Sequence, residues 1–357
     1  MAESPCCAAL RVLLLGAVLA GGPLAAAGPS EQAAPTSEPR ATTTITELKG
    51  LGDTSPAALR EAIWPAGDEG PVQPLVETGK DGDRTLSAWP IEHGCNVLLN
   101  EAEPAFRAKD YPAARAVYSK AVEQFPRCYL ALNFLGDSYY FAGDAVEGAR
   151  WYDRSLALNP DDYRTYFYRG NTLAHQGKKD EALGYYAHAL ALRPRAKSLS
   201  QFMGQNADFL GVEYVENLFT PRAVAKPGKA GGIDVHVDPA GPAHWLGYAL
   251  CKARQLKQQE PGSEGAPRTW SAAAEIECLE TLLESYQEGR RAGHAAAEAE
   301  LEYLLEIARA GFLAELAIYE MGSRVAPTAT LLLPLELRAR MVEFVRRFVI
   351  RVKRAGS

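Results

Sequence analysis

The stretch that decides the fold is "EGARWYDRSLALNP" (Glu147–Pro160), because nearly the same pattern returns 34 residues later as "DEALGYYAHALALRP" (Asp180–Pro194). A small residue, an aromatic residue, a second small residue and a proline keep their spacing in both stretches, and a third copy precedes them. These four positions hold Ala114/Gly148/Ala182, Tyr118/Tyr152/Tyr186, Ala121/Ser155/Ala189 and Pro126/Pro160/Pro194. The sequence therefore predicts three units, at residues 95–128, 129–162 and 163–196.

Each unit has the pattern of two helices joined by a short turn. Gly143 and Gly177 mark the turn, and the closing proline ends the second helix because it cannot continue the hydrogen-bond ladder. A helix pair of this length cannot bury its own apolar faces, so successive pairs must stack. Small residues let the helix axes approach, and the aromatic residue fills the space between them. We expect an all-α fold with a helical-hairpin solenoid over residues 93–200.

The second and third units resemble the tetratricopeptide repeat (TPR) family. The resemblance rests on "LNFLGDSYYFAGDAVEGARWYDRSLALNP" and "YFYRGNTLAHQGKKDEALGYYAHALALRP", which match the family's order of aromatic, Leu-Gly, Tyr, Ala, aromatic, Ala and Pro. It covers about 95–196. The first unit departs from the pattern, with Glu101-Ala102 in place of Leu-Gly, which is typical of an end repeat.

The resemblance implies a concave groove, lined by the first helix of each pair, that binds an extended peptide or a partner helix. By analogy with the family, the positions facing it are Leu99, Glu103, Phe106, Asn133, Asp137, Tyr140, Phe167, Asn171 and His175. The carboxylate clamp of the chaperone-binding subfamily is not matched, because only Arg164 is a basic member. We therefore expect stacking and apolar anchoring of a partner. The alternative is that the aromatic residues only pack repeat against repeat.

The chain upstream of the repeats is expected to be a leader. Residues 1–27 resemble a secretory signal peptide, with Arg11, an apolar run from Val12 to Ala20, and small residues at Ala25–Ala27. The alternatives are an uncleaved anchor or a misassigned start. Residues 28–92 are rich in Pro, Ala, Gly, Thr and charge, which predicts a disordered leader. We expect export to the periplasm, the cell envelope or the exterior.

The chain beyond the repeats has a weaker pattern. Residues 201–241 are expected to form a cap and a linker, and residues 242–357 a C-terminal helical region. The helices expected there lie near 243–259, 269–288, 295–323 and 334–353. This half either continues the solenoid as degenerate hairpins or forms a separate bundle.

Four cysteines remain after the expected cleavage: Cys95, Cys128, Cys251 and Cys278. An even number in an exported chain allows two disulfides. Cys95 and Cys128 lie near the starts of consecutive first helices, and Cys251 and Cys278 lie on neighbouring helices. We predict these two pairs.

A metal site has only weak candidates. "IDVHVD" alternates so that a strand would place Asp234, His236 and Asp238 on one face. The alternative is a surface strand with solvated polar side chains. We expect no cofactor, since the chain shows no phosphate-binding loop and no local set of nucleophile and base. A net charge of −6 disfavours a nucleic-acid partner.

The C-terminal segment "LRARMVEFVRRFVIRVKR" has apolar residues at helical spacing among many arginines, which predicts an amphipathic helix. It is interpreted either as a capping helix with a solvated basic face, or as a site for an acidic partner or an anionic membrane surface.

Two functions are compatible with this organisation. The first is a non-catalytic protein–protein interaction module or assembly scaffold that binds a peptide segment or helix in the groove. The alternative is a metal-dependent enzyme with its site in 201–357, for which the repeats are a recruiting domain.

Overall fold

A computed structural model describes residues 43–229, 232–238, 241–258 and 270–353. The expected signal peptide, 1–27, and residues 28–42 of the expected leader lie outside them. The described chain forms two compact units. The repeat unit contains residues 64–220 and 298–353, and the sheet unit contains residues 43–63 and the described part of 221–297. The fold is mostly helical with stacked helical hairpins, as the sequence predicts.

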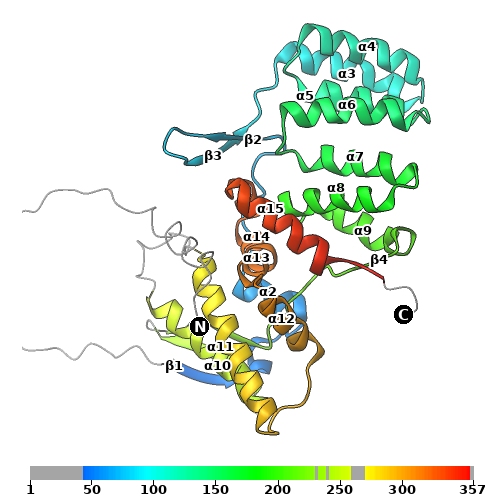
Figure 1. Cartoon of the computed structure of the whole chain (residues 1–357). Coiled ribbons are helices and arrows are strands. Elements are labelled where there is room, and N and C mark those ends of the chain that lie inside the picture. Colours follow the sequence, from blue (N-terminus) through cyan, green and yellow to red (C-terminus); the bar gives the residue numbers. More distant parts are fainter. Residues whose placement is uncertain (1–42, 230–231, 239–240, 259–269, 354–357) are drawn as a thin grey trace, which may run out of the picture. The chain divides into compact units, whose positions relative to one another are not determined.

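The first six helices of the repeat unit form the three predicted hairpins (Figure 1). Within each hairpin the two helices pack together, and successive hairpins stack through α4 against α5 and α6 against α7. The helices are α3 (His93–Arg107), α4 (Tyr111–Gln124), α5 (Tyr129–Tyr140), α6 (Ala145–Leu158), α7 (Tyr163–His175) and α8 (Lys179–Leu192).

The turns inside the hairpins follow from local chemistry. Gly143 and Gly177 have φ of 93° and 77°, a left-handed conformation that glycine adopts without steric cost. Lys109 occupies the equivalent position in the first hairpin with φ of 62°. Asp144 then caps α6, its Oδ1 accepting a hydrogen bond from the Glu147 amide at 3.0 Å. The turn pattern is therefore least favourable in the first repeat.

In the second and third hairpins the two helices meet at a tyrosine–glycine contact, whereas Ala102 holds the glycine position in the first. Tyr152 and Tyr186 are completely buried. A Cβ built on Gly136 would lie 2.8 Å from the Tyr152 ring, and one built on Gly170 would lie 2.6 Å from the Tyr186 ring. Since carbon atoms do not approach so closely, only glycine allows each ring to rest against its helix.

Helix α9 (Lys197–Leu210) is the first helix of a fourth, incomplete repeat. Phe202 and Gly204 follow Tyr168 and Gly170 at the 34-residue spacing. The chain forms no second helix there, so Gly204 is exposed and a Cβ on it would meet nothing within 4 Å. Helix α9 therefore caps α8 and ends the array.

The C-terminal segment returns to the end of the repeats. It forms α12 (Ala299–Arg309), α13 (Leu313–Leu316), a π-helical stretch (Ala317–Gly322), α14 (Ser323–Val325), a 3-10 turn (Ala329–Leu332), α15 (Leu335–Phe344), a second π-helical stretch (Val345–Val349) and β7 (Ile350–Val352). Helix α15 and the π-helical stretch after it pack on α8. Strand β7 pairs antiparallel with β4 (Val212–Tyr214), directly after α9.

A buried carboxylate attaches the C-terminal segment to the end of the repeats. The Glu320 side chain is fully buried and accepts hydrogen bonds from Arg195 and Arg324, each at 3.0 Å. The Leu218 amide donates to the same carboxylate at 3.0 Å. Because a buried carboxylate is stable only when it is paired and hydrogen-bonded, these contacts depend on one another.

The basic residues of the expected amphipathic helix have partners inside the repeat unit. Arg338 pairs with Asp161, Arg340 with Glu315, Arg351 with Glu213 and Lys353 with Asp208. The basic face therefore serves largely to attach the C-terminal segment. Arg346 and Arg347 are exposed, and Arg347 lies 5.0 Å from the centre of the Phe348 ring.

The sheet unit combines distant segments. Its three strands have the order β1 (Thr43–Glu47), β6 (Ile233–Val237), β5 (Ala223–Pro227). Strand β1 runs parallel to β6, and β5 runs antiparallel to it. Helices α2 (Pro56–Ile63) and α10 (Ala243–Gln258) pack on the sheet, and α11 (Ala272–Arg291) packs on α10.

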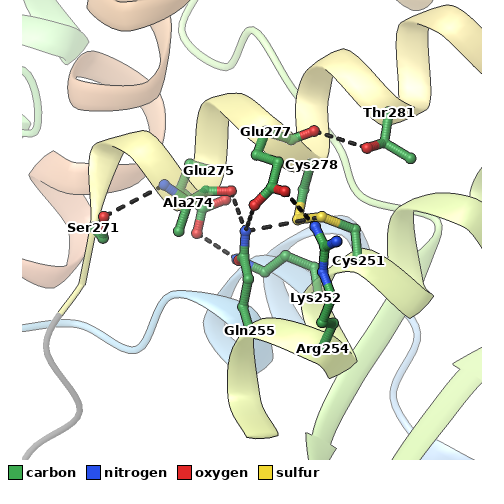
Figure 2. Close-up of a disulfide and its surroundings, with 10 residues drawn as sticks. All are labelled: Cys251, Lys252, Arg254, Gln255, Ser271, Ala274, Glu275, Glu277, Cys278 and Thr281. Carbon is green, nitrogen blue, oxygen red and sulfur yellow. Dashed lines mark hydrogen bonds and ion pairs between the residues drawn. A yellow bond between two sulfur atoms is a disulfide. The ribbon is translucent and has the colours of Figure 1, made fainter. Parts of the chain in front are cut away.

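Two disulfides join the cysteine pairs expected from the sequence. Cys95–Cys128 connects α3 to the start of α5, and Cys251–Cys278 connects α10 to α11. Figure 2 shows the second bond beside Gln255, which donates to the Ala274 carbonyl. Each bond holds two helices together and lowers the conformational entropy of the unfolded chain.

Three expectations about the flanking regions are wrong. Residues 43–92 are not disordered, because they form β1, α2 and the hairpin of β2 (Pro74–Thr78) and β3 (Arg84–Ala88), with Leu59 and Trp64 buried. Residues 211–241 supply sheet strands and are more than a linker. The region 242–357 is neither one solenoid nor one bundle, because it divides between the two units.

The tyrosine–glycine contact predicts opposite effects for the same substitution. Gly170→Ala should lower the free energy of unfolding by about 1–3 kcal/mol, because the added methyl meets the Tyr186 ring. Gly204→Ala is the matched control and should raise it by up to about 1 kcal/mol, since alanine favours the helix and nothing obstructs its side chain. Urea denaturation measures both, and equal effects would contradict this account.

Candidate partner-binding face of the repeats

The first helices carry a polar residue at the position that meets each buried tyrosine. Tyr152 donates a hydrogen bond to the Asp137 carboxylate, and Tyr186 donates to the Asn171 Oδ1 at 2.9 Å. In the first repeat Glu103 has this position, but the buried Tyr118 hydroxyl has no hydrogen-bond partner among the described residues. Asp137 and Asn171 therefore support the hairpin core from within.

Asp137 is an unusual carboxyl. Burial raises its pKa to about 7, while the hydrogen bond from Tyr152 opposes part of that rise. The pKa of Tyr152 is raised by burial and by the neighbouring carboxylate, so the phenol keeps its proton and remains the donor. The carboxyl thus changes charge near neutral pH, at the centre of the second repeat.

Two expected partner-binding residues are buried. Leu99 belongs to the core of the first hairpin. The Asn133 amide nitrogen donates to the Thr165 hydroxyl at 2.8 Å, and that hydroxyl donates back to the Asn133 Oδ1 at 3.1 Å. Asn133 thereby joins α5 to α7, and neither residue is available to a partner.

Two more expected residues are engaged inside the protein. The Arg164 Nε lies 2.9 Å from Asp162, and its guanidinium also donates to the Val72 carbonyl at 3.0 Å. The Phe167 ring packs edge-on against Phe202 of α9, with 4.9 Å between ring centres. Arg164 and Phe167 therefore make contacts within the protein, Arg164 with Asp162 and Val72 and Phe167 with the cap helix α9.

The remaining expected residues lead to an aromatic ridge, which we define as Phe106, Tyr140, Phe141 and His175. Phe106 meets Phe141 edge-on at 5.8 Å between ring centres, and Phe141 meets Tyr140 at 5.2 Å. Tyr140 in turn meets His175 at 5.8 Å. The ridge joins the C-terminal ends of α3, α5 and α7, so it extends over all three repeats.

Phe141 is the most exposed large ring of this ridge, with 57% of its surface accessible. The residue does not appear among the positions expected from the family resemblance. The repeat spacing contains the missing signal, because Phe141 lies 34 residues before His175 and directly follows Tyr140. Such exposed rings on rigid helices can stack on, or enclose, the apolar side chains of a partner.

The weak metal candidates do not form a site. The described residues contain no group of three or more His, Cys, Asp or Glu side chains placed to hold a metal ion. His236 is buried on the central strand of the sheet, with its Nδ1 2.8 Å from the Thr46 hydroxyl. The expectation of a surface hairpin or strand with solvated polar side chains holds in part: β5 and β6 form a hairpin and Asp238 is exposed, whereas His236 is buried.

None of the helices that the structure describes is both long enough and apolar enough to span a membrane.

Comparison with known families identifies the repeats. Residues 99–163 match one tetratricopeptide repeat model, and residues 151–184 match a second. A search of curated proteins finds no significant match. The helical hairpins at 99–184 are therefore supported as tetratricopeptide repeats.

Solved structures that are similar to part of this chain include several repeat proteins. The first TPR domain of human RPAP3 is 20% identical, covers 33% of this chain and 93% of its own, and has a TM-score of 0.32. The Yersinia enterocolitica type III secretion chaperone SycD, solved with a peptide of the translocator YopD, is 15% identical. The match covers 34% of this chain and 92% of SycD, with a TM-score of 0.31. The O-GlcNAc transferase of Thermobaculum terrenum is 26% identical, and the match covers 30% of this chain and 21% of the transferase, with a TM-score of 0.29.

Asp137 predicts a pH-dependent stability. Because the folded-state pKa of Asp137 lies above its unfolded value, the protonated carboxyl stabilises the folded protein at low pH. That contribution to the free energy of unfolding is lost as pH rises from about 4 through about 7. Asp137→Asn keeps an acceptor for Tyr152 and should remove about 1–3 kcal/mol of the stability loss between pH 5 and pH 8. Asn171→Asp should add a similar dependence in the third repeat. Urea unfolding across this range measures both, and a slope unchanged by Asp137→Asn would contradict the assignment.

Proposed function

We propose that this protein is a non-catalytic interaction module or assembly scaffold that binds a peptide segment or helix through the first helices of its tetratricopeptide repeats. The observation that carries the proposal is the aromatic ridge. A contiguous set of rings, one of them largely exposed, is the chemistry that protein interfaces use for their strongest contacts.

The shape of the ridge favours an elongated partner. Its rings come from three successive repeats, whose packed helices lie about 8–10 Å apart. A peptide or helix with apolar side chains at intervals along its length can contact each repeat in turn. The tyrosine–glycine contacts keep the helices rigid, which reduces the entropy lost when the partner binds.

The metal-dependent enzyme has no supporting observation among the described residues. Its sequence support was Asp234, His236 and Asp238, and His236 is buried against Thr46. A further acidic partner or membrane surface at the C-terminal helix is also less well supported, because four of the basic side chains there already pair with carboxylates.

Export remains part of the proposal. The signal-like residues 1–27 motivate it, and the two disulfides support it because such bonds persist in oxidising compartments. Intact-mass measurement of the native protein should find a chain that starts after residue 27, without Cys6 and Cys7. A native chain that retains both cysteines would overturn the cleavage.

The binding proposal is tested with a displayed library of random peptides selected on the purified protein. We expect enrichment of peptides rich in apolar residues, with Kd values of about 1–100 μM. Phe141→Ala should weaken them by about 10-fold or more, because it removes the exposed ring of the ridge.

Val146→Ala is the matched control, since Val146 is similarly exposed but lies on α6, outside the ridge. Binding that survives Phe141→Ala, or that falls equally in both variants, would contradict the assignment of the ridge. Failure to enrich any peptide would contradict the proposed function.

A further inference from the structure

The repeat unit contains a cavity of about 310 Å³ away from the aromatic ridge. Three separate segments of the chain line it: the β2–β3 hairpin, the helices α7 and α8 with the loop before them, and the C-terminal stretch from Thr330 to Val342. A volume of this size is at the lower end of those that hold small molecules in proteins.

The cavity has more positive than negative charge. Arg84 and Arg338 line it together with one carboxylate, Asp161. Arg338 pairs with Asp161 at 2.6 Å, whereas Arg84 donates to the Leu333 carbonyl at 3.0 Å and has no carboxylate within ion-pair distance among the described residues. One guanidinium charge is therefore left without a counter-ion.

Neither guanidinium is fully satisfied. The Nε atoms of Arg84 and Arg338 are both buried, and neither has a hydrogen-bond partner in the part of the chain that the structure describes. Burial and the nearby charge of Arg338 lower the pKa of Arg84, an effect that Asp161 partly opposes. Guanidinium nevertheless keeps its charge in proteins, so the cavity retains a net positive charge with which an anion can pair.

The rest of the cavity wall is apolar or aromatic. Leu192, Leu335, Met341 and Val342 contribute aliphatic surface. Tyr166 and His188 stack with 5.1 Å between ring centres and 6° between ring planes. Burial lowers the pKa of His188, which favours its neutral form, so the positive charge stays at the arginines. One end of the cavity therefore suits an anion, and the remainder suits an apolar body.

We propose that this arginine cavity binds a small carboxylic acid with an apolar body, its carboxylate paired with Arg84 beside Arg338. Bidentate pairing with a carboxylate is the contact for which the guanidinium fork is best suited. The aliphatic residues and the Tyr166–His188 stack then enclose the apolar part of the ligand.

Binding would also strengthen the attachment of the C-terminal segment. The ligand would touch the β2–β3 hairpin, α8 and α15 at once, and these segments are far apart in the sequence. A ligand that binds only when they are assembled stabilises the folded state by mass action. We therefore expect a rise in melting temperature with ligand concentration.

The probe for the test is octanoate, added to the full disulfide-bonded chain, with calorimetry for affinity and thermal unfolding for stability. Octan-1-ol and octylamine have the same apolar body with a neutral or positive head and should bind at least about 10-fold more weakly. Arg84→Gln should weaken octanoate binding by about 10-fold or more, and the substitution breaks no ion pair with a carboxylate of the described residues.

Arg150→Gln is the matched control, because this arginine is exposed on α6 and makes only a surface pair with Glu147. Ala339→Phe is a second variant that fills the cavity and leaves both arginines in place, so it should also abolish binding. The proposal is overturned if octanoate does not bind below about 10 mM, a Kd that corresponds to less than 3 kcal/mol. It is overturned as well if octan-1-ol binds equally, or if Arg84→Gln binds like Arg150→Gln.

Discussion

The contact of a buried tyrosine with a glycine backbone is the constraint on which the second and third repeats depend. It sets how closely the two helices of a hairpin approach, and therefore where the next hairpin can stack. The polar residue that accepts the hydrogen bond from the tyrosine hydroxyl, Asp137 or Asn171, belongs to the same contact. The packing inside each repeat therefore positions the face that carries the aromatic ridge, and the packing of one hairpin sets the position of the next.

The repeats could be predicted because their determinants are local and recur at a constant spacing. The same spacing also contained α9, through Gly204, and Phe141, through His175. Side-chain roles were harder to predict. Asn133 and Asp137 have the positions of partner-binding residues in the family, but Thr165 and Tyr152 engage them inside this protein. Whether a residue faces a partner depends on what its neighbours leave unsatisfied, and repeat position alone does not determine that.

The remaining architecture depends on contacts that leave no local pattern. Strand β1 pairs with β6, about 190 residues further on, so a segment that reads as polar leader becomes part of a sheet. The C-terminal arginines read as a basic surface, yet Asp161, Glu315 and Glu213 neutralise three of them. The two arginines of the cavity lie more than 250 residues apart, and only the folded chain brings them together. In all three cases the partner is supplied by a distant element, which composition and periodicity do not report.

The pairing of β7 with β4 has a consequence for biosynthesis. The strand that closes the end of the array is synthesised about 140 residues after α9, so the three hairpins and α9 leave the ribosome well before it. Until the C-terminal segment emerges, the growing chain must leave the surface of α8 that α15 packs on uncovered and Arg195 without the carboxylate of Glu320. The repeat unit is therefore complete only after β7 has been synthesised, and a nascent chain halted before residue 320 would expose apolar surface of the kind that chaperones bind.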